Sequence, residues 1–166
     1  MVSLRKIVST LTFIGVMFHE LGHQIFCIWT GIKVHKICYF RFGNPAGYVI
    51  HEKPQTFKQS FLITMGPFIT GAFFAVIFFF LTKLNHLNEI YKLLFIWAGG
   101  SIAMNSFPSD VDAKSLWKDS NAQIKRNFFA FIGYPFAFLF WLLNSLTILW
   151  IDVIYAVVLY LFIQKL

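Results

Sequence analysis

Long apolar stretches, separated by shorter polar ones, dominate the hydrophobic pattern of the chain. They lie at about residues 7–30, 57–81, 90–105 and 128–166. One helix over the last stretch would be roughly 58 Å long, about twice the thickness of a hydrocarbon core. We therefore divide this stretch into two helices near residues 144–145. The pattern predicts about five transmembrane helices.

The polar segment between the first two apolar stretches contains two short β-prone runs, Ile37–Phe42 and Gly47–His51. The residues between them, Gly43-Asn44-Pro45-Ala46, form a typical turn sequence. We expect a short β-hairpin at the membrane surface. The predicted fold is thus an all-α polytopic membrane bundle with one membrane-surface β-hairpin between its first two helices.

The composition agrees with a membrane protein, because 58% of the residues are hydrophobic and only 13% are charged. In an average soluble domain about a quarter of the residues are charged. The mean hydropathy is +0.68. For a chain of 166 residues we expect one bundle without an appended soluble domain. Residues 1–166 are therefore predicted to form one domain, with a core over about residues 7–117 and accessory helices over about residues 128–166.

The formal net charge is +7, and the basic residues lie mainly between the apolar stretches. This distribution suits the anionic headgroups of a lipid bilayer and argues against a nucleic-acid partner. The segments after the first and third predicted spans contain five and four of the fourteen Lys and Arg residues. The positive-inside rule places these segments in the cytoplasm and the N-terminus outside. We expect an integral, multi-pass protein, and the small size favours a prokaryotic cytoplasmic membrane.

The first apolar stretch contains the motif His19-Glu20-Leu21-Gly22-His23. Residues four apart on a helix lie one above the other, so the imidazoles of His19 and His23 can bind one metal ion. Glu20 lies beside that face, where it can accept a proton from a metal-bound water molecule. Such ionisable side chains are costly in a membrane helix unless they face the bundle interior. A polar cluster that joins helices by hydrogen bonds is the alternative, but it would not need this order of residues.

A catalytic zinc ion normally takes three protein ligands and leaves one position for water. Asp110 and Asp112 are the candidates for the third ligand, because they form an acidic pair directly after the third apolar stretch. Asp110 follows a Ser and suits the N-cap of a helix that begins near Val111. We therefore prefer Asp112 as the ligand and keep Asp110 as the alternative. Asn105, one turn before Pro108, suits either polar packing or a hydrogen bond to a substrate backbone.

Taken in order, four segments of the chain resemble the site-2 protease family of intramembrane zinc metalloproteases. They are Phe18–His23, Gly47–Val49, Met65–Phe68 and Asn105–Asp112. The resemblance covers about residues 16–117, and the chain looks like a compact, minimal member. The last segment departs from the family, where an Asn-Pro stretch usually leads to Leu-Asp-Gly. Here Asp112 follows Val and precedes Ala.

The resemblance implies a three-helix catalytic core in which His19, His23 and an Asp after the third span bind one zinc ion per chain. Glu20 would activate the water molecule. The resemblance also implies that the extended segment Gly47-Tyr48-Val49 pairs with an unwound substrate strand through main-chain hydrogen bonds. Many members carry PDZ or nucleotide-sensing domains that we do not expect here. Regulation would then come from a membrane partner, a homo-oligomer or the bundle itself.

The sequence thus predicts a zinc-dependent intramembrane endopeptidase whose substrate is a transmembrane protein or peptide. The alternative is a non-proteolytic zinc-binding membrane protein, such as a transport or sensor subunit. Transport would favour polar residues along several spans, and the second, fourth and fifth spans offer few. A scaffold that has lost its activity is a third hypothesis, and the intact histidine motif argues against it.

Overall fold

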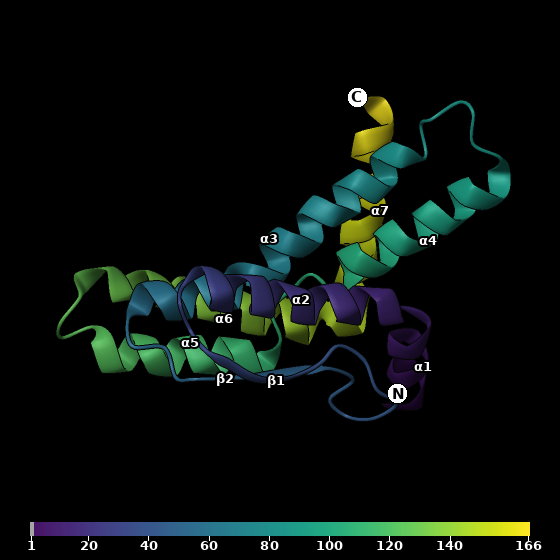
Figure 1. The fold of residues 1–166 in the computed structure, drawn as a ribbon. Helices are drawn as coiled ribbons and strands as arrows, with labels where there is room; N and C mark the ends of the chain where they lie inside the picture. The colour runs from purple at the N-terminus through teal and green to yellow at the C-terminus, as the bar shows by residue number, and fades with distance from the viewer. Residues whose placement is uncertain (1) are drawn as a thin grey trace.

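The computed structural model describes residues 2–166, with side chains from Ile7 onward. Over these residues the fold is mostly helical, with seven α-helices and one two-stranded antiparallel sheet (Figure 1). The elements are α1 (Val2–Leu11), α2 (Phe13–Trp29), β1 (Val34–Cys38), β2 (Tyr48–His51), α3 (Phe57–Leu81), α4 (Glu89–Met104), α5 (Asp110–Gln123), η1 (Phe128–Ile132), α6 (Gly133–Leu146), η2 (Thr147–Leu149) and α7 (Ile151–Lys165), where η denotes a 3-10 helix. The prediction of a mostly helical fold with a hairpin between α2 and α3 is confirmed.

Two helical segments are long and apolar enough to cross a membrane by length and composition, namely Phe57–Leu81 and Phe128–Leu149. The other apolar helices are shorter, since α2 has 17 residues, α4 has 16 and α7 has 15. The first apolar stretch is divided at Thr12, whose hydroxyl donates to the Val8 carbonyl (2.9 Å) and accepts from the Asn105 side chain (3.1 Å). By this criterion the described part of the chain has two candidate spans, against the five predicted.

The last apolar stretch divides into α6 and α7, a few residues later than predicted. Asn144 remains helical, and its side chain donates to the Phe140 carbonyl (2.8 Å) and to the Pro108 carbonyl (2.7 Å). The chain instead turns at Trp150, which has a left-handed backbone conformation with φ 59°. The polar Asn144 therefore ties α6 to the segment before α5.

The hairpin has a wider turn than predicted. β1 ends at Cys38, whereas the prediction extended the first strand to Phe42. β2 agrees with its predicted bounds to within one residue. The prediction for the first strand is wrong because Arg41 bonds within its own loop. Its backbone N–H donates to the Ala46 carbonyl at 2.7 Å.

α2 and α3 cross in close contact at two glycines. A Cβ on Gly22 would lie 2.7 Å from Pro67 Cα, and a Cβ on Gly66 would lie 2.7 Å from the Gly22 carbonyl oxygen. Any larger residue at either position would push the two helices apart. α3 also changes direction part-way along its length (Figure 1), as expected for a helix with a proline in its interior.

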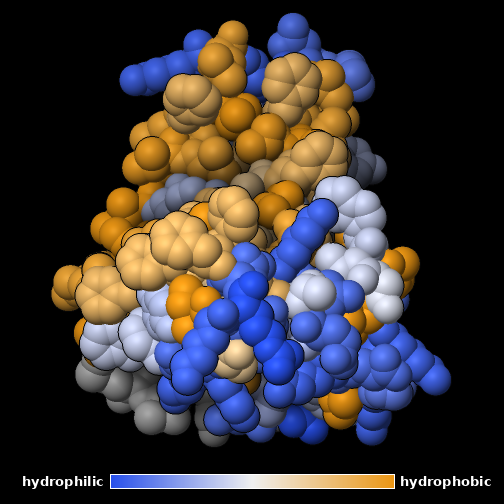
Figure 2. Space-filling view, turned by 90° about the vertical axis from the view of Figure 1, so that its left-hand side faces the viewer, coloured by the Kyte–Doolittle hydropathy of each residue, from blue (hydrophilic) through white to orange (hydrophobic). Residues whose placement is uncertain are grey.

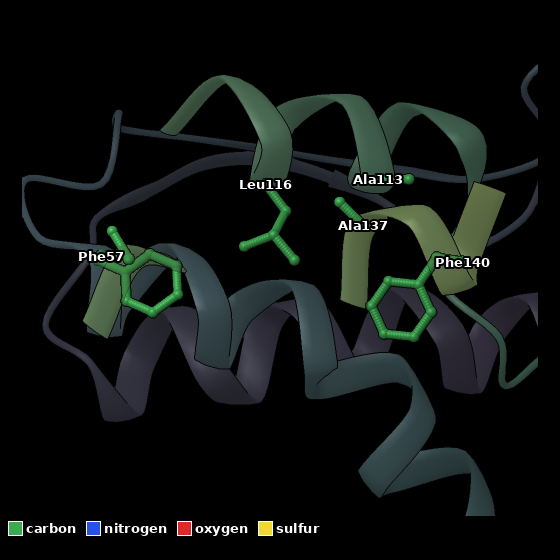
Figure 3. Close-up of a cluster of buried hydrophobic side chains, with 6 residues drawn as sticks. Phe57, Ala113, Leu116, Ala137 and Phe140 are labelled. Carbon is green, nitrogen blue, oxygen red and sulfur yellow. The ribbon is translucent and has the colours of Figure 1, made fainter. Parts of the chain in front are cut away.

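Two clusters of buried apolar side chains hold the other helices against α3. The first joins α3, α5, η1 and α6 (Figure 3) and consists of Phe57, Ala113, Leu116, Ala130, Ala137 and Phe140. The second joins α3, α4 and α7 and consists of Ala75, Phe79, Ile102, Ala103, Ala156 and Ile163. The beginning of α3 thus packs against α5, and its end packs against α4 and α7.

Large apolar side chains lie exposed on the outer helices. Examples on α6 and α7 are Phe138, Trp141, Val158, Leu161 and Phe162, each more than half exposed. Figure 2 shows apolar surface over the upper part of one face, with polar residues at its top edge and a larger polar area below. Apolar surface of this extent marks a contact with a membrane or a partner protein. Together with the two candidate spans, it is the surface expected of a membrane protein.

A buried hydrogen bond joins α3 to α5. The Ser60 hydroxyl donates to Asp119 Oδ2 at 2.6 Å, and the two residues are 3% and 5% exposed. Asp119 lies two helical turns after Asp112, on the same side of α5. The bond therefore fixes the position of α5 along α3.

We predict that Ser60→Ala lowers the free energy of unfolding by about 1–3 kcal/mol, because the Asp119 carboxylate stays buried without its donor. Unfolding in mixed detergent micelles measures this change. The matched control is Ser145→Ala, which removes an exposed hydroxyl that donates to the Trp141 carbonyl within α6. The control should change the stability by less than about 0.5 kcal/mol. Equal stabilities of the two variants would contradict the prediction.

Candidate metal centre

The two histidines of the motif project from one side of α2, one helical turn apart. Their ring centroids lie 5.0 Å apart. The side chains of His19 and His23 are 14% and 10% exposed, so both are largely enclosed by protein. The structure therefore has the arrangement that the four-residue spacing predicts.

A main-chain carbonyl orients each imidazole. His19 Nδ1 lies 2.8 Å from the Asn105 carbonyl oxygen, and His23 Nδ1 lies 3.0 Å from the Ile63 carbonyl oxygen. A carbonyl oxygen can only accept, so each Nδ1–H donates and each Nε2 keeps its lone pair. Second hydrogen bonds of this kind fix the ring orientation of metal-binding histidines. Both histidines are therefore prepared to bind a metal ion through Nε2.

Asp112, in the first turn of α5, faces the same two nitrogens. Its Oδ1 lies 3.4 Å from His23 Nε2, and its Oδ2 lies 3.7 Å from His19 Nε2. One ligand atom from each of the three residues lies within 4.8 Å of the others. Ligand atoms lie about 3.4 Å apart in a tetrahedral zinc site with bonds of about 2.0–2.2 Å. Two imidazoles and one carboxylate at these distances fit a catalytic zinc site.

The alternative ligand, Asp110, lies outside this cluster of three. It is exposed and is the first residue of α5. The N-cap of the helix is Ser109, whose hydroxyl accepts from the Asp112 N–H at 3.3 Å. The assignment of Asp110 as the N-cap is therefore wrong by one residue. The preference for Asp112 does not depend on it, because Asp112 is the acid that faces the imidazoles.

Glu20 lies beside the histidines and is covered by the backbone that leads into β2. It is 7% exposed. A Cβ on Gly47 would lie 2.7 Å from Glu20 Cγ and 2.9 Å from Glu20 Oε1. Only glycine leaves room for the carboxylate at this point. The hairpin thus sets how far the Glu20 side chain can move.

One cavity of about 600 Å³ contains the cluster. Its walls come from α2, β2 and the loop before it, α3, the end of α4, the start of α5, and the end of α6 with η2. The predicted site residues that line it are His19, Glu20, His23, Gly47, Tyr48, Val49, Asn105, Asp110 and Asp112. The structure thus brings all of the residues predicted for catalysis, metal binding and substrate binding around one space.

Asn105 holds the site together through both its main chain and its side chain. Its carbonyl oxygen accepts from His19, as described above. Its side-chain Nδ2 donates to the Thr12 hydroxyl (3.1 Å) and to the Ser101 carbonyl (2.9 Å). Both amide hydrogens are occupied within the protein, which favours polar packing over a hydrogen bond donated to substrate.

Neither Ile63 nor Ser109 is predicted as a site residue from the sequence. A Ser three residues before an acidic residue is a capping-box signal, so Ser109 could have been found from the sequence. The Ile63 carbonyl has no such signal, because its contact with His23 depends on the crossing of two helices.

A comparison with models of protein families identifies the family of this chain. A model of the family Peptidase M50B-like matches residues 1–106, which is more than half of the chain. The matched region includes α2, the hairpin, α3 and α4, and it ends before Asp110 and Asp112. No curated protein and no solved structure gives a significant match. The chain therefore belongs to the Peptidase M50B-like family, and with it to the site-2 protease family of intramembrane zinc metalloproteases.

Proposed function

We propose that the protein is a zinc-dependent endopeptidase that hydrolyses peptide bonds in membrane-embedded or membrane-adjacent segments of other proteins. The observation that carries this proposal is the convergence of His19, His23 and Asp112 beside Glu20 in one cavity. Three ligands with an adjacent carboxylate are the side chains that a zinc peptidase needs. Membership of the family supports the same chemistry.

In the proposed mechanism His19, His23 and Asp112 would hold one zinc ion, which would supply Lewis acidity when bound. Glu20 accepts a proton from the attacking water and passes it to the nitrogen of the leaving peptide. The low exposure of Glu20 strengthens its electrostatic interactions, because little bulk water surrounds the carboxylate. Gly47 keeps the carboxylate beside the ligands.

We further propose that the substrate binds along β2. In the two-stranded sheet, one edge of β2 pairs with β1. Gly47, Tyr48 and Val49 also line the cavity. An extended peptide that adds to the other edge would satisfy its main-chain hydrogen bonds and lie near Glu20. A transmembrane helix would have to unwind locally to bind in this way.

We further propose that α2, α3, α4, α6 and α7 cross the bilayer as the five spans. The hairpin and α5 then lie on the cytoplasmic side, which the basic residues Lys36, Lys53, Lys114 and Lys118 support. α4 and α7 would be about 22–24 Å long, which is shorter than the roughly 30 Å of a hydrocarbon core. Local thinning of the bilayer accommodates helices of this length.

Glu20→Gln should reduce the turnover of fluorogenic transmembrane peptides at least about 100-fold, because Gln cannot accept the proton. Zinc should stay bound, since Glu20 is not one of the three ligands. Cleavage in proteoliposomes and metal content are measured on the same preparations. The control Glu52→Gln changes an acid outside the cavity and should leave both quantities unchanged. Undiminished cleavage by Glu20→Gln would refute the general-base role, and zinc-loaded wild type without activity would favour the non-proteolytic alternative.

Asp112→Ala and Asp110→Ala separate the two candidate ligands. We expect Asp112→Ala to lose most of its zinc, because two imidazoles alone remain at the site. Asp110→Ala should keep full stoichiometry, because Asp110 lies outside the cluster. Elemental analysis after dialysis against a weak chelator measures the zinc content of both variants. Full zinc in Asp112→Ala, or loss of zinc in Asp110→Ala, would disprove the assignment.

Gly47→Ala tests whether the hairpin positions Glu20. The added methyl group would displace the carboxylate or the strand, and we expect turnover to fall about 10–100-fold with zinc retained. Gly43→Ala is the matched control in the same loop, because its Cβ would meet only the Arg41 side chain at 3.5 Å or more. Turnover of both variants is measured with the same fluorogenic peptides. If Gly47→Ala turned over as fast as Gly43→Ala, the hairpin would have no part in placing Glu20.

A further inference from the structure

The two oxygens of the Asp112 carboxylate have different surroundings. Oδ2 accepts from the Ser109 N–H at 2.8 Å and from the Ser109 hydroxyl at 2.6 Å. Each carboxylate oxygen offers about two lone-pair sites, so these two donors fill both sites of Oδ2. Oδ1 lies 3.4 Å from His23 Nε2, and Oδ2 lies 3.7 Å from His19 Nε2.

We propose that Ser109 is a positioning residue that makes Asp112 a metal ligand through one oxygen, Oδ1. The assignment rests on the zinc site of the proposed function. A carboxylate that is free to rotate can bind a metal ion through both oxygens, and the second oxygen would compete for the position that water needs. Two hydrogen bonds to Oδ2 oppose that rotation. Ser109 thereby keeps the fourth coordination position open.

The two residues form a reciprocal capping box. The Ser109 hydroxyl donates to Oδ2 and accepts from the Asp112 N–H at 3.3 Å. The same pair of residues therefore also supplies an acceptor to a main-chain N–H in the first turn of α5. The carboxylate also lies at a helix N-terminus, where a negative charge is favoured. The first turn of α5 therefore sets the orientation of the Asp112 carboxylate on its own helix.

Ser109 is in turn held by the segment before it. The Asn144 side chain on α6 donates to the Pro108 carbonyl at 2.7 Å. Pro108 is among the fully buried side chains. The N–H and hydroxyl groups of Ser109 are thus held in place, as a positioning residue requires.

Three substitutions separate the hydroxyl of Ser109 from its capping role. Ser109→Ala removes both the hydroxyl and a good cap, whereas Ser109→Gly removes the hydroxyl and leaves a tolerated N-cap. We expect both to weaken zinc binding about 10–100-fold, as loss of a partner of a metal ligand typically does. Ser109→Thr restores a capping hydroxyl and should bind zinc within about threefold of wild type. Competition with a chromophoric chelator measures the dissociation constant of the full-length, detergent-solubilised protein.

Thr56→Ala is the matched control, because Thr56 forms the capping box of α3 with Gln59 and contacts no metal ligand. It should lower the melting temperature as Ser109→Ala does, without a change in zinc affinity. Zinc K-edge X-ray absorption adds a second readout. The number of nitrogen and oxygen neighbours should rise by about one in Ser109→Gly, because only the main-chain N–H of residue 109 then holds Oδ2 and the carboxylate can rotate to bind through both oxygens.

The outcomes distinguish the two proposals. A wild type that binds no zinc would overturn the proposed function and this assignment together. Zinc-binding wild type with unchanged affinity and neighbour number in Ser109→Gly would overturn the role of Ser109 alone. Weakened zinc binding in Thr56→Ala equal to that of Ser109→Ala would also overturn it, because a general loss of stability would then explain both.

Discussion

The close crossing of α2 over α3 is the contact on which the metal centre depends. Gly22 belongs to the histidine motif itself and touches the backbone of α3 at Gly66 and Pro67. Because no side chain separates the helices there, the Ile63 carbonyl, one turn before Gly66, reaches 3.0 Å from His23 Nδ1. A wider crossing would leave this imidazole without its acceptor and would turn its Nε2 away from the shared centre. The glycine inside the motif is thus as much a part of the site as the histidines beside it.

The hydrogen-bond partners of His19 and Asp112 come from one short connection between α4 and α5. Its first residue, Asn105, caps α4 and supplies the acceptor for His19. Its last residue, Ser109, caps α5 and donates to Asp112. Between them Ser106 packs on a third glycine, Gly71, where an added Cβ would lie 2.5 Å from Ser106 Cβ. One helix-to-helix turn, packed against α3, therefore orients two candidate ligands, His19 of α2 and Asp112 of α5.

Features that depend on residues close together in the sequence could be predicted, whereas those that depend on contacts between distant helices could not. The pairing of His19 with His23 depends only on the period of a helix, so the spacing was sufficient to predict it. Asp112 was preferred over Asp110 on capping preference alone, with an incorrect N-cap, and only the packing of α5 on α3 separates the two residues. The Ile63 and Asn105 carbonyls belong to every peptide bond and carry no sequence signal. The number of membrane spans is equally hard to predict, because apolar composition does not reveal the break at Thr12 or the shortness of α7.

Hydrolysis in an apolar bundle needs a supply of water, and the hairpin gives a physical account of how water reaches the site. The cavity that contains Glu20 is also lined by Asn44 and Pro45, which are exposed at the tip of the loop before β2. Polar groups along this wall can hold water, whereas the exposed apolar surfaces of α6 and α7 cannot. Water can therefore enter beside the hairpin without crossing the outer helices. Under the proposed function, this short polar segment would cover Glu20, bind the substrate strand and admit water, which the apolar helices cannot do.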